Sequence, residues 1–194
     1  AAFIWTPQTG IRLFSEFIGY SGSRWLRVLA VSADGTTFVG TETQEGKNLG
    51  WPYSNGFIWS QSEGFQSVSG LTEATAISDN GKVVVGYGYT DASGTTWWKS
   101  GVKQGSYKGI ESFYWTKESG TIALSPPFPG VQPTPNWTGS GPGNTADNRP
   151  YGVSADGSII SGTFKSGSGT RGYIWTEDTE FAETGLPFGW QDQH

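Results

Sequence analysis

Several residue types that carry chemistry in other proteins are missing, or nearly so, from this sequence. Its 194 residues contain no cysteine and a single histidine, His194, which is the last residue. Disulfides and thiolate catalysis are therefore excluded, and the Ser-His-Asp and Cys-His arrangements have no internal histidine to use. Zinc and transition-metal sites lack their usual ligands for the same reason. We expect no cofactor, no metal ion and no catalytic residue.

Charge and long apolar runs are also scarce. Only 15% of the residues are charged, and the net charge is −5. The chain has no stripe of Lys and Arg such as a nucleic-acid-binding surface needs. No apolar stretch approaches the roughly 20 residues of a membrane-spanning helix. We therefore expect neither a nucleic-acid partner nor a membrane span.

Glycine and aromatic residues are abundant instead. The chain has 30 Gly, and 15% of its residues are aromatic, including 10 Trp. This composition favours strands and turns, and no window shows a sustained helical period of apolar residues. We predict an all-β fold that occupies residues 1–194 as a single domain.

One stretch occurs three times and organises the chain. Each copy has a small residue, an apolar residue, Ser, two further residues, Gly, and then an apolar run that ends in Gly. Gly in Asp-Gly or Asn-Gly supplies the positive φ of a tight turn, and the Ser can bond the backbone there. This Ser motif therefore predicts a hairpin, with Asp34, Asp79 and Asp156 as turn residues. The copies are residues 30–40, 76–86 and 152–162.

A second motif alternates with the first. It consists of an aromatic residue, Ile or Tyr, Trp, and Thr or Ser, followed by a turn and another short strand. We call it the Trp motif and predict a second type of hairpin from it. The four copies are residues 3–6, 57–60, 113–116 and 173–176, and their tryptophans are Trp5, Trp59, Trp115 and Trp175.

Two hairpins in each period of fifty-odd residues amount to four antiparallel strands, which is typical of a β-propeller blade. We expect the four tryptophans to be core residues packed between neighbouring blades. The count is three and a half blades, which leaves open edges. Either the chain is part of a longer array, or two chains close together. The predicted parts are a half blade at 2–14 and blades at 29–68, 74–124 and 151–185.

Together the two motifs resemble the HAF-family extracellular repeats of bacteria. The resemblance rests on [FY]-[IY]-W-[TS], a Gly turn, and V-S-A-D-G followed by an apolar run ending in Gly, and it covers most of the chain outside the long insertions. It implies a β-propeller and an extracellular or cell-surface location. It implies no catalytic residue, because the function of that family is largely undefined.

Long insertions are predicted on one face of the disc, where the links between hairpins emerge. They span about 15–28, 41–55, 87–111 and 125–150 and are rich in aromatic residues. A flat ring covers the C–H face of a sugar while polar side chains bond its hydroxyls, and the same side chains suit a protein interface. The candidate ligand-binding residues are Trp25, Trp51, Tyr53, Trp97, Trp98 and Trp137.

Three functions fit this pattern. The first is a non-enzymatic recognition or adhesion module that binds a carbohydrate or a protein through the aromatic loops. The second is a glycosidase or polysaccharide lyase that uses loop carboxylates, with Arg24, Arg27 and Arg149 as anion partners. The third is a self-assembling surface or fibre subunit, a homo-oligomer formed through open blade edges. The loop carboxylates are Glu16, Glu42, Glu45, Asp91, Glu111 and Asp147.

Overall fold

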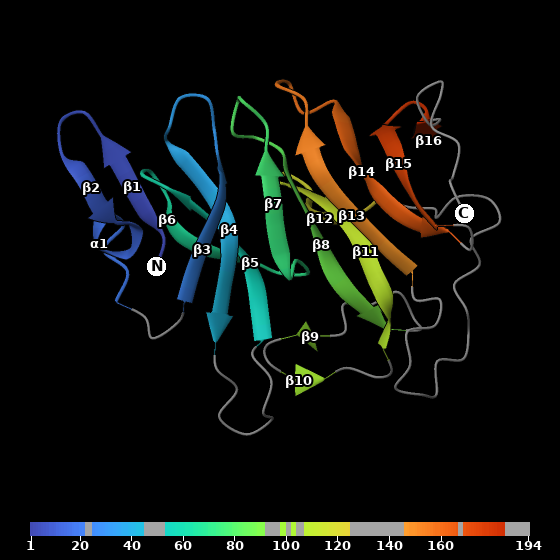
Figure 1. Cartoon of the computed structure of the whole chain (residues 1–194), viewed down its shortest axis with the longest axis horizontal. Coiled ribbons are helices and arrows are strands. Elements are labelled where there is room, and N and C mark those ends of the chain that lie inside the picture. The colour runs from blue at the N-terminus through green and yellow to red at the C-terminus, as the bar shows by residue number, and fades with distance from the viewer. Residues whose placement is uncertain are drawn as a thin grey trace.

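A computed structural model describes residues 1–21, 25–44, 53–91, 98–99, 102–103, 107–124, 146–166 and 169–184. It confirms the prediction of an all-β chain built from four-stranded antiparallel sheets (Figure 1). The sequence predicts no helix, whereas the described part of the chain contains one helical turn, α1 (Phe14–Phe17). No helix in that part is long and apolar enough to cross a membrane.

The chain begins with a hairpin that stands apart from the larger sheets. Its strands pair antiparallel, and Gly10 ends the turn between them with a φ of 66°. The helical turn α1 follows directly and buries Phe14. We call this part the N-terminal hairpin. Its strands are β1 (Phe3–Thr6) and β2 (Gly10–Leu13).

The first unit is a four-stranded antiparallel sheet in which the Ser-motif hairpin pairs with the Trp-motif hairpin. The strands follow one another in space as in sequence, because each connection returns to the strand beside it. They are β3 (Trp25–Val31), β4 (Thr37–Gln44), β5 (Tyr53–Ser60) and β6 (Gly64–Val68).

The second and third units repeat this order and are joined where β11 and β13 pair in parallel over two residues. The second unit consists of β7 (Glu73–Ile77), β8 (Val84–Asp91), β11 (Tyr107–Thr116) and β12 (Gly120–Ala123). The third consists of β13 (Ala146–Val153), β14 (Ile159–Ser166), β15 (Gly169–Thr176) and β16 (Glu180–Thr184). A separate short pair is formed by β9 (Trp98–Lys99) and β10 (Val102–Lys103).

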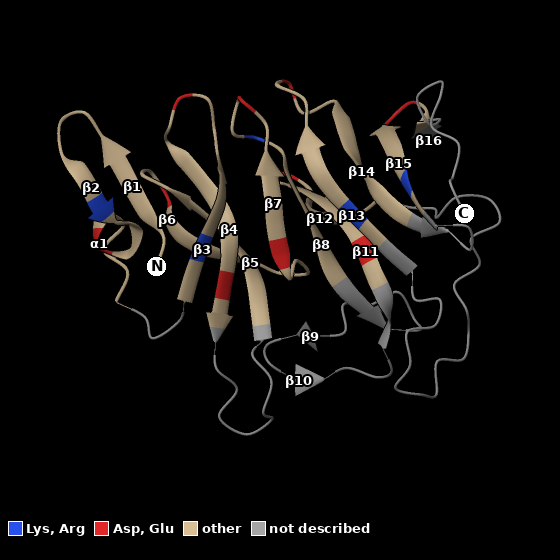
Figure 2. Ribbon diagram, viewed as in Figure 1, with Lys and Arg blue, Asp and Glu red and all other residues tan. Residues whose placement is uncertain are grey.

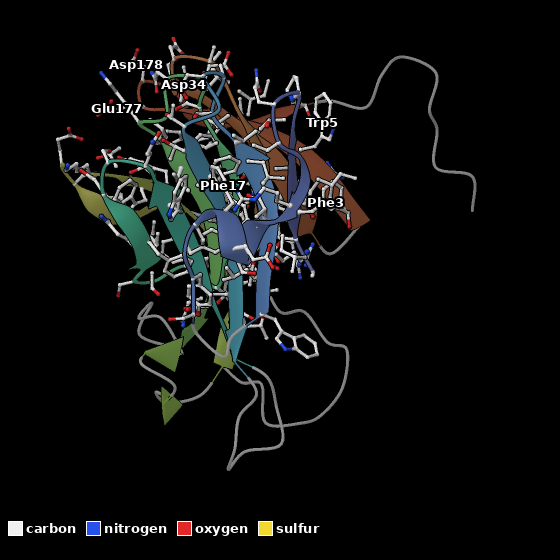
Figure 3. The ribbon with its side chains drawn as sticks, turned by 90° about the vertical axis from the view of Figure 1, so that its left-hand side faces the viewer. Phe3, Trp5, Phe17, Asp34, Glu177 and Asp178 are labelled. Carbon is white, nitrogen blue, oxygen red and sulfur yellow. The ribbon has the colours of Figure 1, made fainter. Side chains whose placement is uncertain are left out.

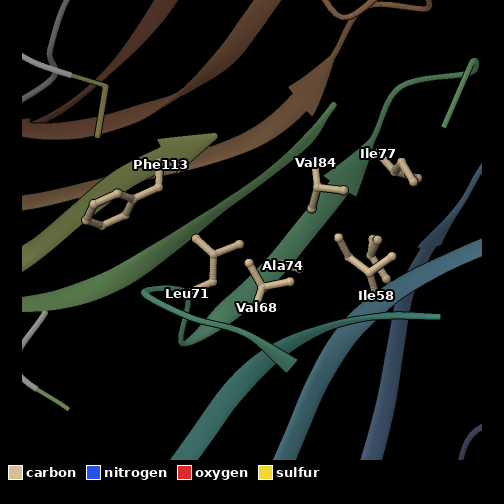
Figure 4. Packing of buried hydrophobic residues seen from close by; sticks show 8 residues of the cluster. Ile58, Val68, Leu71, Ala74, Ile77, Val84 and Phe113 are labelled. Atoms are coloured by element: carbon tan, nitrogen blue, oxygen red, sulfur yellow. The ribbon is translucent and has the colours of Figure 1, made fainter. Parts of the chain in front are cut away.

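Three hydrophobic clusters form the core, and each one lies between consecutive parts of the chain. Phe57 and Trp59 face back toward the N-terminal hairpin, since alternate residues of a strand point to opposite sides. Ile58 between them faces the second unit and packs in the cluster of Figure 4. The Trp motif therefore supplies two rings to the preceding interface and one residue to the following interface.

Three of the four motif tryptophans lie in these interfaces. Trp59 is buried, and Trp115 and Trp175 are partly buried against the clusters on either side of the second unit. The prediction that Trp5 is a core residue is wrong, because 61% of its surface is exposed. The side of β1 that carries it is open to solvent in the part of the chain that the structure describes.

A β-bulge in the first strand of each unit explains why the apolar run of the Ser motif ends in glycine. The register shifts between Val28 and Ala30, and at the same place in β7 and β13. The bulge brings a backbone carbonyl of the first strand against the glycine of the second, so closely that a Cβ there would collide with it. The glycines are Gly40, Gly86 and Gly162, and the carbonyls are those of Arg27, Glu73 and Arg149.

The turn of the Ser motif is held by its own side chains, as predicted. In the third copy the Ser154 hydroxyl donates to Asp156 Oδ1 at 2.6 Å and accepts from the Ile159 backbone N–H at 2.9 Å. The same carboxylate oxygen accepts from the Ser158 backbone N–H at 3.0 Å. These bonds fix the turn, in which Gly157 has a φ of 86°.

The middle copy corrects the assignment of its turn residue. The side chain that takes the place of the carboxylate is Asn80, whose Oδ1 accepts from Ser78 Oγ at 2.8 Å and from the Lys82 N–H at 2.9 Å. Asp79 instead uses its backbone carbonyl to accept from the Ala33 N–H of the first unit at 3.2 Å. Asp79 therefore lies in the turn, but Asn80 supplies the side-chain bonds, and the backbone of Asp79 joins two neighbouring turns.

Acid should weaken the two turns that carry a carboxylate. The hydrogen bond from Ser154 and that from the Ser158 N–H lower the pKa of Asp156 from 3.8 to about 2, and equivalent bonds lower the pKa of Asp34. A lowered folded-state pKa contributes stability above the unfolded value, and this contribution is lost as the pH falls through the folded value. We expect wild-type stability to fall between pH 4 and pH 2 and Asp34→Asn/Asp156→Asn to flatten this decline.

Urea unfolding at several pH values measures this effect. The middle turn shows that Asn fits the position, so the double variant should fold at neutral pH. Glu177→Gln/Asp178→Asn removes two charges from another exposed turn and serves as the matched control. Equal acid slopes for the two double variants would contradict the prediction.

Candidate functional site

Both ends of every connection between the second and third strands of a unit lie at one end of the sheets. Because the pairing is antiparallel, β4, β8 and β14 finish there, and β5, β11 and β15 begin there (Figure 1). We call this the connection end. The predicted insertions are too wide, because 41–44, 53–55, 87–91 and 107–111 belong to strands. Alternating Gly and Tyr after Gly86 continue the strand pairing that we assigned to a loop.

Trp25 is the predicted ligand residue whose side chain the structure describes. It is the first residue of β3 rather than part of the preceding loop, and 72% of its surface is exposed. Tyr53 and Trp98 belong to β5 and β9, but their side chains lie outside the described part. The remaining candidates, Trp51, Trp97 and Trp137, lie outside the described residues.

A row of charged residues lies on the first strands of the three units, level with the middle of the second strands. Arg27, Glu73 and Arg149 occupy the same position, whose carbonyl meets the closing glycine (Figure 2). Arg27 Nη1 lies 3.4 Å from Glu73 Oε2, and Thr41 Oγ1 donates to the same oxygen at 3.3 Å. The guanidinium of Arg149 lies over the ring of Tyr87, 4.7 Å from its centre.

Arg27 and Arg149 are predicted from the sequence only as partners of loop carboxylates, and Glu73 is not predicted as a site residue. A sequence pattern marks these three residues as equivalent, because each one stands three positions before the small residue that opens a Ser motif. The equivalence becomes evident only when the bulges set the register.

Trp25 lies on the same strand as Arg27, which forms the ion pair with Glu73. It is two residues from Arg27 on β3, so both side chains leave the same face of the strand. Thr43 pairs with Trp25 across the sheet, and its hydroxyl is 3.0 Å from that of Ser54 on β5. The arrangement offers a flat exposed ring with a guanidinium, a carboxylate and hydroxyls nearby, and this combination can bind a polyhydroxylated ligand.

Glu42 has a structural role instead of a place in this surface. It lies on the other face of β4 and is buried, with only 3% of its surface exposed. Its carboxylate accepts from the Tyr20 hydroxyl at 2.9 Å and from Ser67 Oγ at 3.1 Å. These bonds connect the segment after α1 to β4 and β6. A buried carboxylate that accepts two hydroxyls is an anchor for three segments.

The other predicted carboxylates are not gathered into one place. Glu16 lies on α1 and Glu111 on β11, so these two belong to different parts of the fold. The side chains of Glu45, Asp91 and Asp147 lie outside the described residues. Within the described ranges, no three His, Cys, Asp or Glu side chains are close enough to hold a metal ion.

Buried hydroxyl groups form a hydrogen-bond network beside Arg149, the third residue of the charged row. Ser112 Oγ on β11 donates to Asn148 Oδ1 on β13 at 2.8 Å and lies 2.9 Å from the hydroxyl of Tyr173 on β15. Burial raises the pKa of Tyr173 above its ordinary value, so the phenol stays protonated. This network joins the second and third units next to Arg149 and keeps that part of the surface rigid.

Comparison with known proteins finds a likeness of fold among solved structures. No family model and no curated protein matches this sequence. The fold is similar to part of TolB from Acinetobacter baumannii, with a TM-score of 0.46 and 13% sequence identity. The likeness covers 81% of this chain and 32% of the TolB chain, so the chain spans about a third of that protein.

Proposed function

We propose that this chain is a non-enzymatic recognition module of the cell exterior that binds carbohydrate through its connection end. The proposal includes the architecture expected from the motifs, three β-propeller blades preceded by a half blade. One observation carries it: Trp25 exposes most of its ring on the same face of β3 as the Arg27–Glu73 ion pair. A large apolar ring held at a rigid strand end, outside the core, is suited to a ligand.

The chemistry of the surface suits a sugar chain. The indole face would cover the C–H face of one sugar ring, where apolar contact costs no hydrogen bond. Arg27 donates hydrogen bonds and Glu73 accepts them, so hydroxyls of either orientation find a partner. The hydroxyl of Thr43, the residue that pairs with Trp25 across the sheet, lies 3.0 Å from that of Ser54 and adds further hydrogen-bonding groups. A protein ligand remains the second reading, because the same side chains suit an interface hot spot.

Removing the Trp25 ring should weaken binding to an insoluble polysaccharide. Loss of one stacked ring costs of order 1–3 kcal/mol, which is about 5- to 150-fold in affinity. We expect Trp25→Ala to elute from the retaining polysaccharide while keeping the wild-type melting temperature, because the ring is mostly exposed. A pull-down against a panel of polysaccharides, with wild type and variant side by side, measures this.

Trp5→Ala is the matched control, because Trp5 is nearly as exposed but lies on the N-terminal hairpin, away from the charged row. It should bind as the wild type does. Equal loss of binding in both variants would show general adhesion of exposed rings and contradict the proposal.

The alternative of a carbohydrate-active enzyme is tested by assaying the supernatants for new reducing or unsaturated ends. Product that disappears in Glu73→Gln would favour the carbohydrate-active enzyme over the recognition module.

A further inference from the structure

Within the part of the chain that the structure describes, strand β1 lacks a neighbour that every equivalent strand has. The strands that carry the other Trp motifs, β5, β11 and β15, pair on both edges, with the second and fourth strands of their units. Among the described residues β1 pairs with β2 alone, in a two-stranded sheet. Its other edge is the one where a second strand would lie.

The rings of β1 are exposed where those of the equivalent strands are covered. Phe3 is 65% exposed, whereas Phe57, at the same position of its motif, is 0% exposed. Figure 3 views the molecule from this end and shows Phe3 and Trp5 projecting from the hairpin. Ile11 and Leu13 pair with these residues on β2 and are exposed too. The apolar patch thus runs along β1 to its open edge.

The three complete units show which strand fits such an edge. In each, the closing glycine of the second strand lies opposite the first ring of the Trp motif, and a buried apolar residue lies opposite the Trp. Glycine is needed there because a Cβ at Gly162 would meet the ring of Tyr173, and one at Gly40 would meet that of Phe57. The apolar residues opposite the tryptophans are Phe38, Val84 and Ile160.

We propose that the open edge of β1 is a docking site for one antiparallel strand of a further Ser-motif hairpin. Its glycine would lie opposite Phe3 and its apolar residue opposite Trp5. The proposal continues a pairing that the chain already makes in three places, and it is independent of the sugar site. A folded second copy cannot supply this strand, because its own β4, β8 and β14 are paired on both edges. Strand addition of this kind combines backbone hydrogen bonds with side-chain pockets.

A synthetic peptide with the sequence of residues 158–165 tests the proposal on the full chain. It carries Ile160 and Gly162 at the required spacing and is free of the rest of its hairpin. We expect it to slow hydrogen–deuterium exchange several-fold at those backbone amides of residues 3–6 that point to the open edge, because they would gain partners. The same peptide with Gly162→Val should bind at least about tenfold more weakly, since its side chain would collide with the Phe3 ring.

Variants of the protein separate strand addition from general apolar contact. Phe3→Ser/Trp5→Ser should abolish protection by the peptide, while Ile11→Ser, an equally exposed change on β2, should retain most of it. Equal binding of the Gly162→Val peptide, or no protection of residues 3–6 by either peptide, would overturn the proposal. So would a dimer of the chain that dissociates in Trp5→Ser, because a second copy would then cover the rings.

Discussion

Gly86→Ala should lower the free energy of unfolding by about 3 kcal/mol or more, the upper end for forcing an atom into a packed site. Its Cβ would collide with the backbone carbonyl of Glu73 and approach the Cα of Ala74. Neither atom belongs to a flexible side chain that could move aside. The bulge is held by the pairs on both sides of it, Ala74 with Gly86 and Ala76 with Val85, so the backbone resists displacement.

Gly152→Ala is the matched control for this prediction. Gly152 lies beside the equivalent bulge of the third unit, and a Cβ there would meet only the hydroxyl oxygen of Ser161, which can rotate away. The other two copies of the motif carry Ala30 and Ala76 at this position. We expect a change within about 0.5 kcal/mol. Denaturant unfolding of both variants measures the difference, and similar losses would show that the bulge does not set the requirement for glycine.

Phe57→Ala should lower the free energy of unfolding by about 3–5 kcal/mol, the usual cost of deleting a fully buried ring. Phe57 has no exposed surface, and its ring stacks on that of Phe65 with centres 5.0 Å apart. It also lies within the cluster that joins the N-terminal hairpin to the first unit. The cavity left by the ring cannot close by a shift of the backbone, because β5 is paired on both edges. We expect a lower urea midpoint and loss of the hairpin's contact with the first unit.

Phe3→Ala makes the same change at the same position of another Trp motif. Because the Phe3 ring is mostly exposed, the free energy of unfolding should change by no more than about 0.5 kcal/mol. The pair of variants holds the local sequence pattern constant and varies only the environment. A large loss in Phe3→Ala would mean that some part of the chain covers this ring, and it would remove the basis of the docking site.

The sequence was sufficient to predict the hairpins and their alternation. Asp-Gly and Asn-Gly turns favour hairpins locally, and the Ser in each turn bonds backbone within five residues, so these features need no distant contact. Strand ends were less predictable. The predicted insertion 87–111 begins directly after Gly86, but residues 87–91 continue β8 because β11 lies alongside to pair with them.

The candidate site was predictable only in part. Trp25 stands out in the sequence as an aromatic residue in the predicted insertion 15–28. The structure shows that its ring is exposed, and its role in binding stays a prediction. The row of Arg27, Glu73 and Arg149 depends on which residues of three separate strands come level with one another, and each bulge shifts that register by one residue. An alternating pattern with one residue inserted does not reveal its register until the partner strand is known.

Local backbone chemistry thus accounts for the turns, the hairpins and the closing glycines, because the forces that require them act between residues close in the chain or on one paired strand. The burial of each motif, in contrast, is decided by the tertiary structure. Phe3 and Phe57 open the same four-residue pattern, yet one is exposed and the other fully buried. Burial depends on whether another sheet packs against that face, and this contact is made by residues far away in the sequence.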